Sequence, residues 1–169
     1  RTVHKAIPQM IDLVASSMSY HTHHPNVQHV GARTLQHLAK IESERIDSRL
    51  KATIMKSLHD IHLNLADAND TSEFDDLPRY ERALFASTHA LRDFAVDASS
   101  VATLSSLGIL ESVVDTLRKF PKARRHSESG LKLLCASLKL CPTMLSDTNT
   151  VQQEERSVVL VRWVYAAIG

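Results

Sequence analysis

A helical sequence pattern occurs three times in this chain with its residues in the same order. Residues 26–41 (NVQHVGARTLQHLAKI) are echoed by residues 80–96 (YERALFASTHALRDFAV) and, more faintly, by residues 125–140 (RHSESGLKLLCASLKL). A repeat of roughly 40–50 residues is typical of an α-solenoid, in which each unit buries its apolar face against its neighbours. The pattern therefore predicts an all-α chain built from stacked helical units.

The spacing of the three copies predicts which residues are equivalent. Superposing Leu35 on Leu91 gives an offset of 56 residues, and the step from Leu91 to Leu134 is 43 residues. The excess of 13 equals the length of the polar segment 67–79, which we interpret as a surface loop inserted into a repeat of 43. We therefore expect Leu35, Leu91 and Leu134 to be buried at equivalent positions.

Apolar residues at spacings of three and four predict the individual helices. Asn26 is a plausible N-cap for the second of them, and Gly108 is expected to break the fifth into a shorter and a longer part. The predicted helices cover residues 3–19, 26–41, 50–65, 80–96, 101–120, 127–140 and 154–168.

Two pairs of segments resemble armadillo repeats. They are AIPQMIDLVASSM followed by HPNVQHVGARTLQHLAKI, and FASTHALRDFA followed by LSSLGILESVVDTLRKF; HEAT-type repeats are the alternative. The resemblance implies a single domain over residues 1–169, a right-handed superhelix of about three to four repeats. Its concave groove would hold a peptide or helix, lined by residues 3–19, 50–65, 109–120 and 158–168.

The chain lacks one signature of this family. Importin-α-like adaptors hold basic peptides with a Trp followed four residues later by Asn, whereas Trp163 here is followed by Ala167. A nuclear-import role is therefore not predicted, although Trp163 remains a candidate partner-binding residue. The chain begins without Met and ends directly after an apolar run, so we expect a fragment of a longer protein.

A basic cluster lies in RKFPKARRHS, at an expected helix end and the loop after it. The helix macrodipole favours cations at a helix C-terminus, which explains part of the cluster. The functional interpretation is a docking patch for an acidic partner, and RRHS also matches a basophilic kinase site at Ser127. Nucleic acid is not favoured, because the net charge is only +1 and no further basic face accompanies the cluster. The candidate partner-binding residues are Arg118, Lys119, Lys122, Arg124 and Arg125.

Histidines and acidic residues give no metal site by spacing. His21, His23 and His24 precede Pro25, and His59 and His62 lie three residues apart on a predicted helix. No further ligands fall at a spacing that completes a zinc site, so we interpret these histidines as partly exposed polar residues. The acidic loop lacks the glycine and the final Glu of an EF-hand. We predict no metal and no cofactor.

Catalytic motifs are also absent from the sequence: it contains no GxSxG, P-loop, HExxH or paired CxxC. The chain is therefore predicted to be non-enzymatic, with no small-molecule substrate and no membrane-spanning run. We expect a protein-binding scaffold, a subunit of a larger complex, with a cytoplasmic location that includes the cytoskeleton. The alternative function is a regulatory helical domain of a larger enzyme such as a kinase or GTPase. A compact helical bundle is the alternative architecture.

Overall fold

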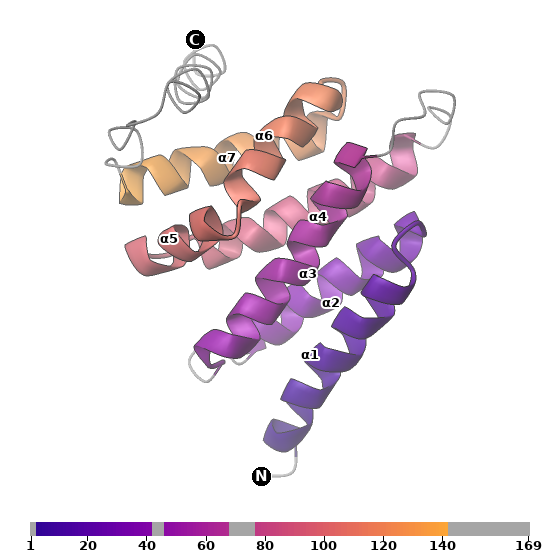
Figure 1. Cartoon of the computed structure of the whole chain (residues 1–169), viewed down its shortest axis with the longest axis vertical. Coiled ribbons are helices and arrows are strands. Elements are labelled where there is room, and N and C mark those ends of the chain that lie inside the picture. Colours follow the sequence, from indigo (N-terminus) through magenta and orange to yellow (C-terminus); the bar gives the residue numbers. More distant parts are fainter. Residues whose placement is uncertain (1–2, 42–45, 68–76, 142–169) are drawn as a thin grey trace.

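The computed structural model describes residues 3–41, 46–67 and 77–141, and all regular structure in these ranges is helical. The all-α class is therefore confirmed for this part of the chain. The predicted helix 154–168 lies outside the described residues. In chain order the helices are α1 (Val3–Tyr20), α2 (Pro25–Ile41), α3 (Ser48–Asp67), α4 (Leu77–Phe94), α5 (Ala98–Ser106), α6 (Ile109–Lys119) and α7 (Arg124–Leu140) (Figure 1).

Two helices begin at or just before a proline that the sequence analysis placed outside them. α2 begins at Pro25, so Asn26 already lies inside the helix and the predicted N-cap is wrong. α4 begins at Leu77, with Pro78 in its first turn. Proline is tolerated there because backbone N–H groups in the first turn have no acceptor within the helix. The inserted loop is consequently shorter than predicted and does not account for all of the extra residues in that repeat.

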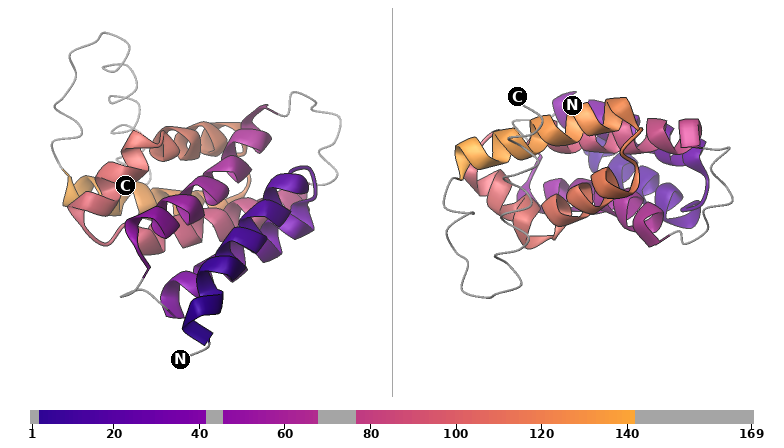
Figure 2. Two further views of the ribbon diagram at one scale, coloured as in Figure 1. Left: turned by 60° about the horizontal axis from the view of Figure 1, so that its bottom comes forward. Right: turned by 90° about the horizontal axis from the view of Figure 1, so that it is seen from above.

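The helices pack in two rows. In one row α2 packs against α4 and α4 against α7; in the other α1 packs against α3 and α3 against α6. Contacts between α1 and α2, α3 and α4, and α6 and α7 join the rows, and α5 packs against α6 and α7. The view from above in Figure 2 shows the rows as two layers. One row therefore contains the three copies of the sequence pattern, which are α2, α4 and α7. The other row contains the accompanying segments α1, α3 and α6.

Neighbouring helices within a row run in the same direction with a constant register. Between α2 and α4, His29 contacts the Arg82 carbonyl and Gln36 contacts His89, both 53 residues apart. Between α3 and α6, His59 contacts Ser112 at the same separation of 53 residues. Contacting residues on neighbouring helices are thus 53 residues apart in both rows. This separation differs from the alignment offset of 56 by about one helical turn.

Gly108 separates α5 from α6, as predicted. Its φ of 70° lies in the left-handed region that favours glycine, and the two helices meet at an angle of 68°. At the alignment offset of 56 residues the equivalent of Gly108 is Ala52, and there α3 continues unbroken through 20 residues. One repeat therefore has a single long helix where the next has a bent pair.

The predicted equivalent leucines are buried. Leu35 and Leu91 are fully inaccessible and Leu134 is 4% exposed, and all three belong to the same core cluster. Two aligned glycines also lie at close contacts between the rows. A Cβ at Gly31 would overlap the Met18 side chain on α1, and a Cβ at Gly130 would lie 3.1 Å from a Leu117 methyl on α6. The burial predicted from the alignment is therefore confirmed.

Candidate functional site

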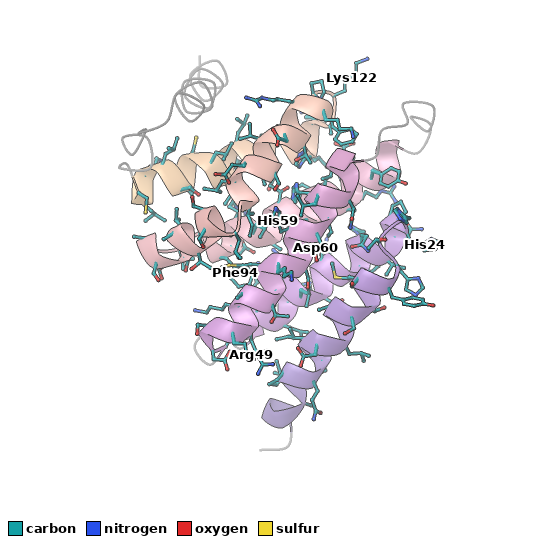
Figure 3. The ribbon with its side chains drawn as sticks, viewed as in Figure 1. His24, Arg49, His59, Asp60, Phe94 and Lys122 are labelled. Atoms are coloured by element: carbon teal, nitrogen blue, oxygen red, sulfur yellow. The ribbon has the colours of Figure 1, made fainter. Side chains whose placement is uncertain are left out.

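The five basic residues predicted to bind a partner lie together where α6 ends and α7 begins. Arg118 and Lys119 end α6, Lys122 lies in the turn, and Arg124 and Arg125 start α7. All except the half-buried Lys119 are exposed. Figure 3 shows Lys122 projecting from this turn, away from the helices. We call these five residues the basic edge.

Helix electrostatics explain only part of the basic edge. The C-terminus of α6 carries a partial negative charge that favours Arg118 and Lys119. The N-terminus of α7 carries the opposite partial charge, which disfavours Arg124 and Arg125. The sequence analysis placed the start of α7 at residue 127 and therefore missed this conflict. Two cations at the positive end of a helix have no structural explanation in the macrodipole.

Acidic groups neutralise the basic edge in part, since the Glu81 carboxylate on α4 accepts a hydrogen bond from the Arg125 backbone N–H at 3.2 Å. Arg118 forms an exposed ion pair with Asp115 at 3.4 Å, and Lys119 lies 5.8 Å from the centroid of the Phe120 ring. Within the described ranges, no ion pair involves the side chains of Lys122, Arg124 or Arg125. The surface is therefore a concentrated positive charge that an acidic ligand would complement.

Two other sequence-based candidates are placed differently. Ser127 lies in the first turn of α7, partly buried, with its backbone N–H donating to the Ala123 carbonyl at 2.8 Å. A phosphate there would be near a helix N-terminus, and its phosphorylation stays a prediction. Trp163 lies outside the described residues, so its proposed role in partner binding also stays a prediction.

The sequence analysis missed a cavity of about 440 Å³ where α2 and α4 end. Asp93 lies at its rim, where it accepts hydrogen bonds from Lys40 at 2.9 Å and Gln36 at 2.5 Å. Burial opposes ionisation of this carboxyl, but the bonds from Lys40 and Gln36 outweigh it and lower the pKa of Asp93. The pKa of His89 is also lowered, by burial and by the Arg92 cation, whose guanidinium donates to Nε2 at 2.9 Å. The cavity is therefore lined by charged side chains and by apolar side chains that include Ala39, Ile46 and Phe94.

The chain matches no protein-family model, no curated protein and no solved structure. The resemblance to armadillo repeats therefore rests on the residues that suggested it.

Four side chains from four helices form a closed, fully buried hydrogen-bonding ring. His62 on α3 contacts Thr116 on α6 at 3.1 Å and Thr88 on α4 at 3.4 Å. His126 on α7 contacts the same two hydroxyls, each at 3.1 Å. Each neutral imidazole supplies one hydrogen to the ring. The two hydroxyls share theirs between the ring and the backbone, because Thr88 also donates to the Leu84 carbonyl at 2.8 Å and Thr116 to the Val113 carbonyl at 3.0 Å. We call it the histidine–threonine ring.

Burial determines the protonation of this ring. The pKa of His62 is well below its ordinary value, first because of burial and then because of the neighbouring His126 and His59. Burial alone lowers the pKa of His126 from 6.5 to about 4. The interpretation of His62 as a partly exposed residue is therefore wrong, because both faces of α3 are covered here. His59 and His62, three residues apart on α3, both contact α6.

Neither a metal-binding cluster nor a single membrane-spanning helix is found in the described ranges. No group of three or more His, Cys, Asp or Glu side chains there is placed to hold a metal ion. His21 and His24 are in ring contact at 5.6 Å in the turn before α2, without acidic neighbours in that contact. No single helix there is long and apolar enough to span a bilayer. Together α5 and α6 have sufficient length and apolar composition, but the pair is bent by 68°.

Proposed function

We propose that the chain is a non-catalytic scaffold, a right-handed armadillo-like α-solenoid of three to four repeats, that holds a protein partner within a larger assembly. The basic edge binds an acidic segment of that partner. The groove of the solenoid is the second surface for the same partner, by resemblance to armadillo repeats.

The regular packing supports the repeat architecture. A solenoid requires that equivalent helices stack in the same direction at a constant register, since each unit contacts only its neighbours. The separation of 53 residues between bonded side chains recurs in both rows of helices. A compact bundle around one centre imposes no such recurrence.

The observation that carries the binding function is the position of Arg124 and Arg125. These cations stand at the positive end of α7, where the macrodipole disfavours them, and their side chains have no ion-pair partner in the described ranges. An acidic ligand would offset this repulsion by binding the two guanidinium groups. The backbone N–H groups of Arg124 and Arg125 already donate, to the Lys122 carbonyl and to Glu81. Binding of an acidic ligand would therefore add to the charge compensation that Glu81 supplies at this helix end.

Charge reversal of the basic edge tests this function. All of its members except Lys119 are replaced by glutamate, and partners are recovered from cell extract and quantified at two salt concentrations. We expect recovery of a salt-sensitive partner to fall by on the order of tenfold, because long-range attraction and contacts are both lost. The fold should be unaffected, since the four side chains are exposed.

A control variant reverses the same number of cations on other surfaces of the described helices. It should retain the salt-sensitive partners at the wild-type level. Equal recovery by the wild-type, edge-reversed and control chains would refute the role of the basic edge. Loss of partners only after nuclease treatment would instead indicate nucleic acid. The control positions are Arg49, Lys51, Lys56 and Lys139.

A further inference from the structure

The face of α4 that α2 covers is well defined by contacts. The ring of His29 contacts the Arg82 carbonyl at 3.1 Å, and Gln36 contacts His89 at 2.7 Å and Asp93 at 2.5 Å. Ala86 lies on the same face of the helix, between these residues, and is only 3% exposed. A neighbouring parallel helix therefore buries this stripe of α4.

The equivalent stripe of α2 is left open. Under the register that superposes Leu35 on Leu91, Ala86 corresponds to Val30. Val30 is 61% exposed, whereas its equivalent on α4 is buried. The residues of α2 that correspond to Arg82, His89 and Asp93 are Asn26, Arg33 and His37. The same stripe is thus covered on α4 and uncovered on α2, which lies with α1 at one end of the stack (Figure 1).

A groove lies between α1 and the first part of this open stripe, where Asn26 and Val30 line it. It has a volume of about 420 Å³, and its lining includes Val14, Ser17 and Met18 of α1 and Val27, Val30 and Thr34 of α2. On the same helix as Val14, Leu13 is 71% exposed and Met10 is 45% exposed. Exposed apolar side chains on a helix that lines a groove are typical of an interaction surface. We call this surface the end face.

We propose that the end face binds an amphipathic helix of a partner protein, lying parallel to α2 as α2 itself lies on α4. The internal repeat supplies the geometry of this complex, because the α2–α4 interface shows how such a helix is seated. The proposal does not depend on the basic edge, so each can fail alone.

The repeat also predicts the charge of the bound helix. On α4, the residues that meet Gln36 and Lys40 of α2 are His89 and Asp93. Their equivalents on the end face are Arg33 and His37, so a carboxylate is the complementary group at both positions. The partner helix therefore carries small or apolar residues along its seam and acidic residues toward its C-terminal end.

A peptide made from α2 tests the proposal. The acidic peptide is residues 25–41 with Gln36→Glu and Lys40→Glu; the basic peptide has Gln36→Lys alone. Fluorescence anisotropy of the labelled acidic peptide should show saturable binding to the chain. The affinity of the acidic peptide should fall about tenfold or more with the chain variants Arg33→Glu and Val30→Asp. The Arg33→Glu chain should in turn prefer the basic peptide.

Several outcomes would overturn the proposal. One is the absence of saturable binding by the acidic peptide to a chain whose circular dichroism shows that it is folded. Another is equal binding of both peptides to the wild-type and Arg33→Glu chains. Sedimentation that reveals a dimer which Val30→Asp dissociates would make a second copy of the chain the occupant. The edge-reversed chain should bind the acidic peptide as the wild type does, which separates this test from that of the basic edge.

Discussion

Acidification from pH 7 to pH 5 is expected to lower the free energy of unfolding by about 2 kcal/mol through His126 alone. Burial holds the pKa of this histidine at about 4 in the folded chain, against 6.5 when it is exposed. Between these values the unfolded chain binds a proton that the folded chain does not, so lowering the pH favours unfolding. The loss begins near pH 6.5 and reaches about 3 kcal/mol at pH 4. His62 acts in the same direction, because burial lowers its pKa too.

Urea unfolding at a series of pH values measures this effect. The slope of the unfolding free energy against pH gives the number of protons taken up on unfolding, independently of the absolute stability. His126→Gln should reduce that number by about one near pH 5. Leu13→Ala, which removes no titratable group and lies at an exposed position, is the control and should leave the slope unchanged. A wild-type stability that is flat from pH 7 to pH 5 would contradict the burial of a neutral histidine–threonine ring.

Periodicity was sufficient to predict the helices, because each has one apolar face. The predicted cores of α1, α2, α3 and α6 are correct, and Gly108 breaks the chain where expected. The starts were predicted less well. α2 and α4 include prolines, which the first turn of a helix tolerates. The start of α7 was placed three residues late, at Ser127, because the preceding basic residues are unfavourable at a helix N-terminus.

The surfaces differ in how far the sequence could predict them. The basic edge is contiguous in the chain, so its residues could be grouped without knowing the fold. The cavity at Asp93 and the histidine–threonine ring join residues from different helices, such as Gln36 with Asp93 and His62 with Thr116. Their recognition requires the register between helices. The sequence offsets of the repeat approximate that register to within about one turn, which is too coarse to pair individual side chains.

Replacement of Leu91 by alanine is expected to lower the free energy of unfolding by about 2–5 kcal/mol. Leu91 is fully buried on α4, and α4 packs against α2, α3 and α7, so few of its neighbours can move to fill the space. Leu13→Ala is the matched control: the same atoms are removed at a site that is 71% exposed, and the cost should be about 0.5 kcal/mol or less. Urea unfolding monitored by circular dichroism measures both. A cost below about 1 kcal/mol for Leu91→Ala would contradict the alignment of the three leucines.

The same substitution at the three aligned leucines distinguishes stacked repeats from a bundle. In a stack, the stability of each unit depends on its contacts with the next, and an inner unit has two such contacts. Leu91 lies on the middle helix of its row, whereas Leu35 and Leu134 lie on α2 and α7 at the ends of the described row. A stack therefore predicts the largest loss for Leu91→Ala and smaller, similar losses for Leu35→Ala and Leu134→Ala. Three equal losses with one shared unfolding transition would instead indicate a single core in which all helices contribute alike.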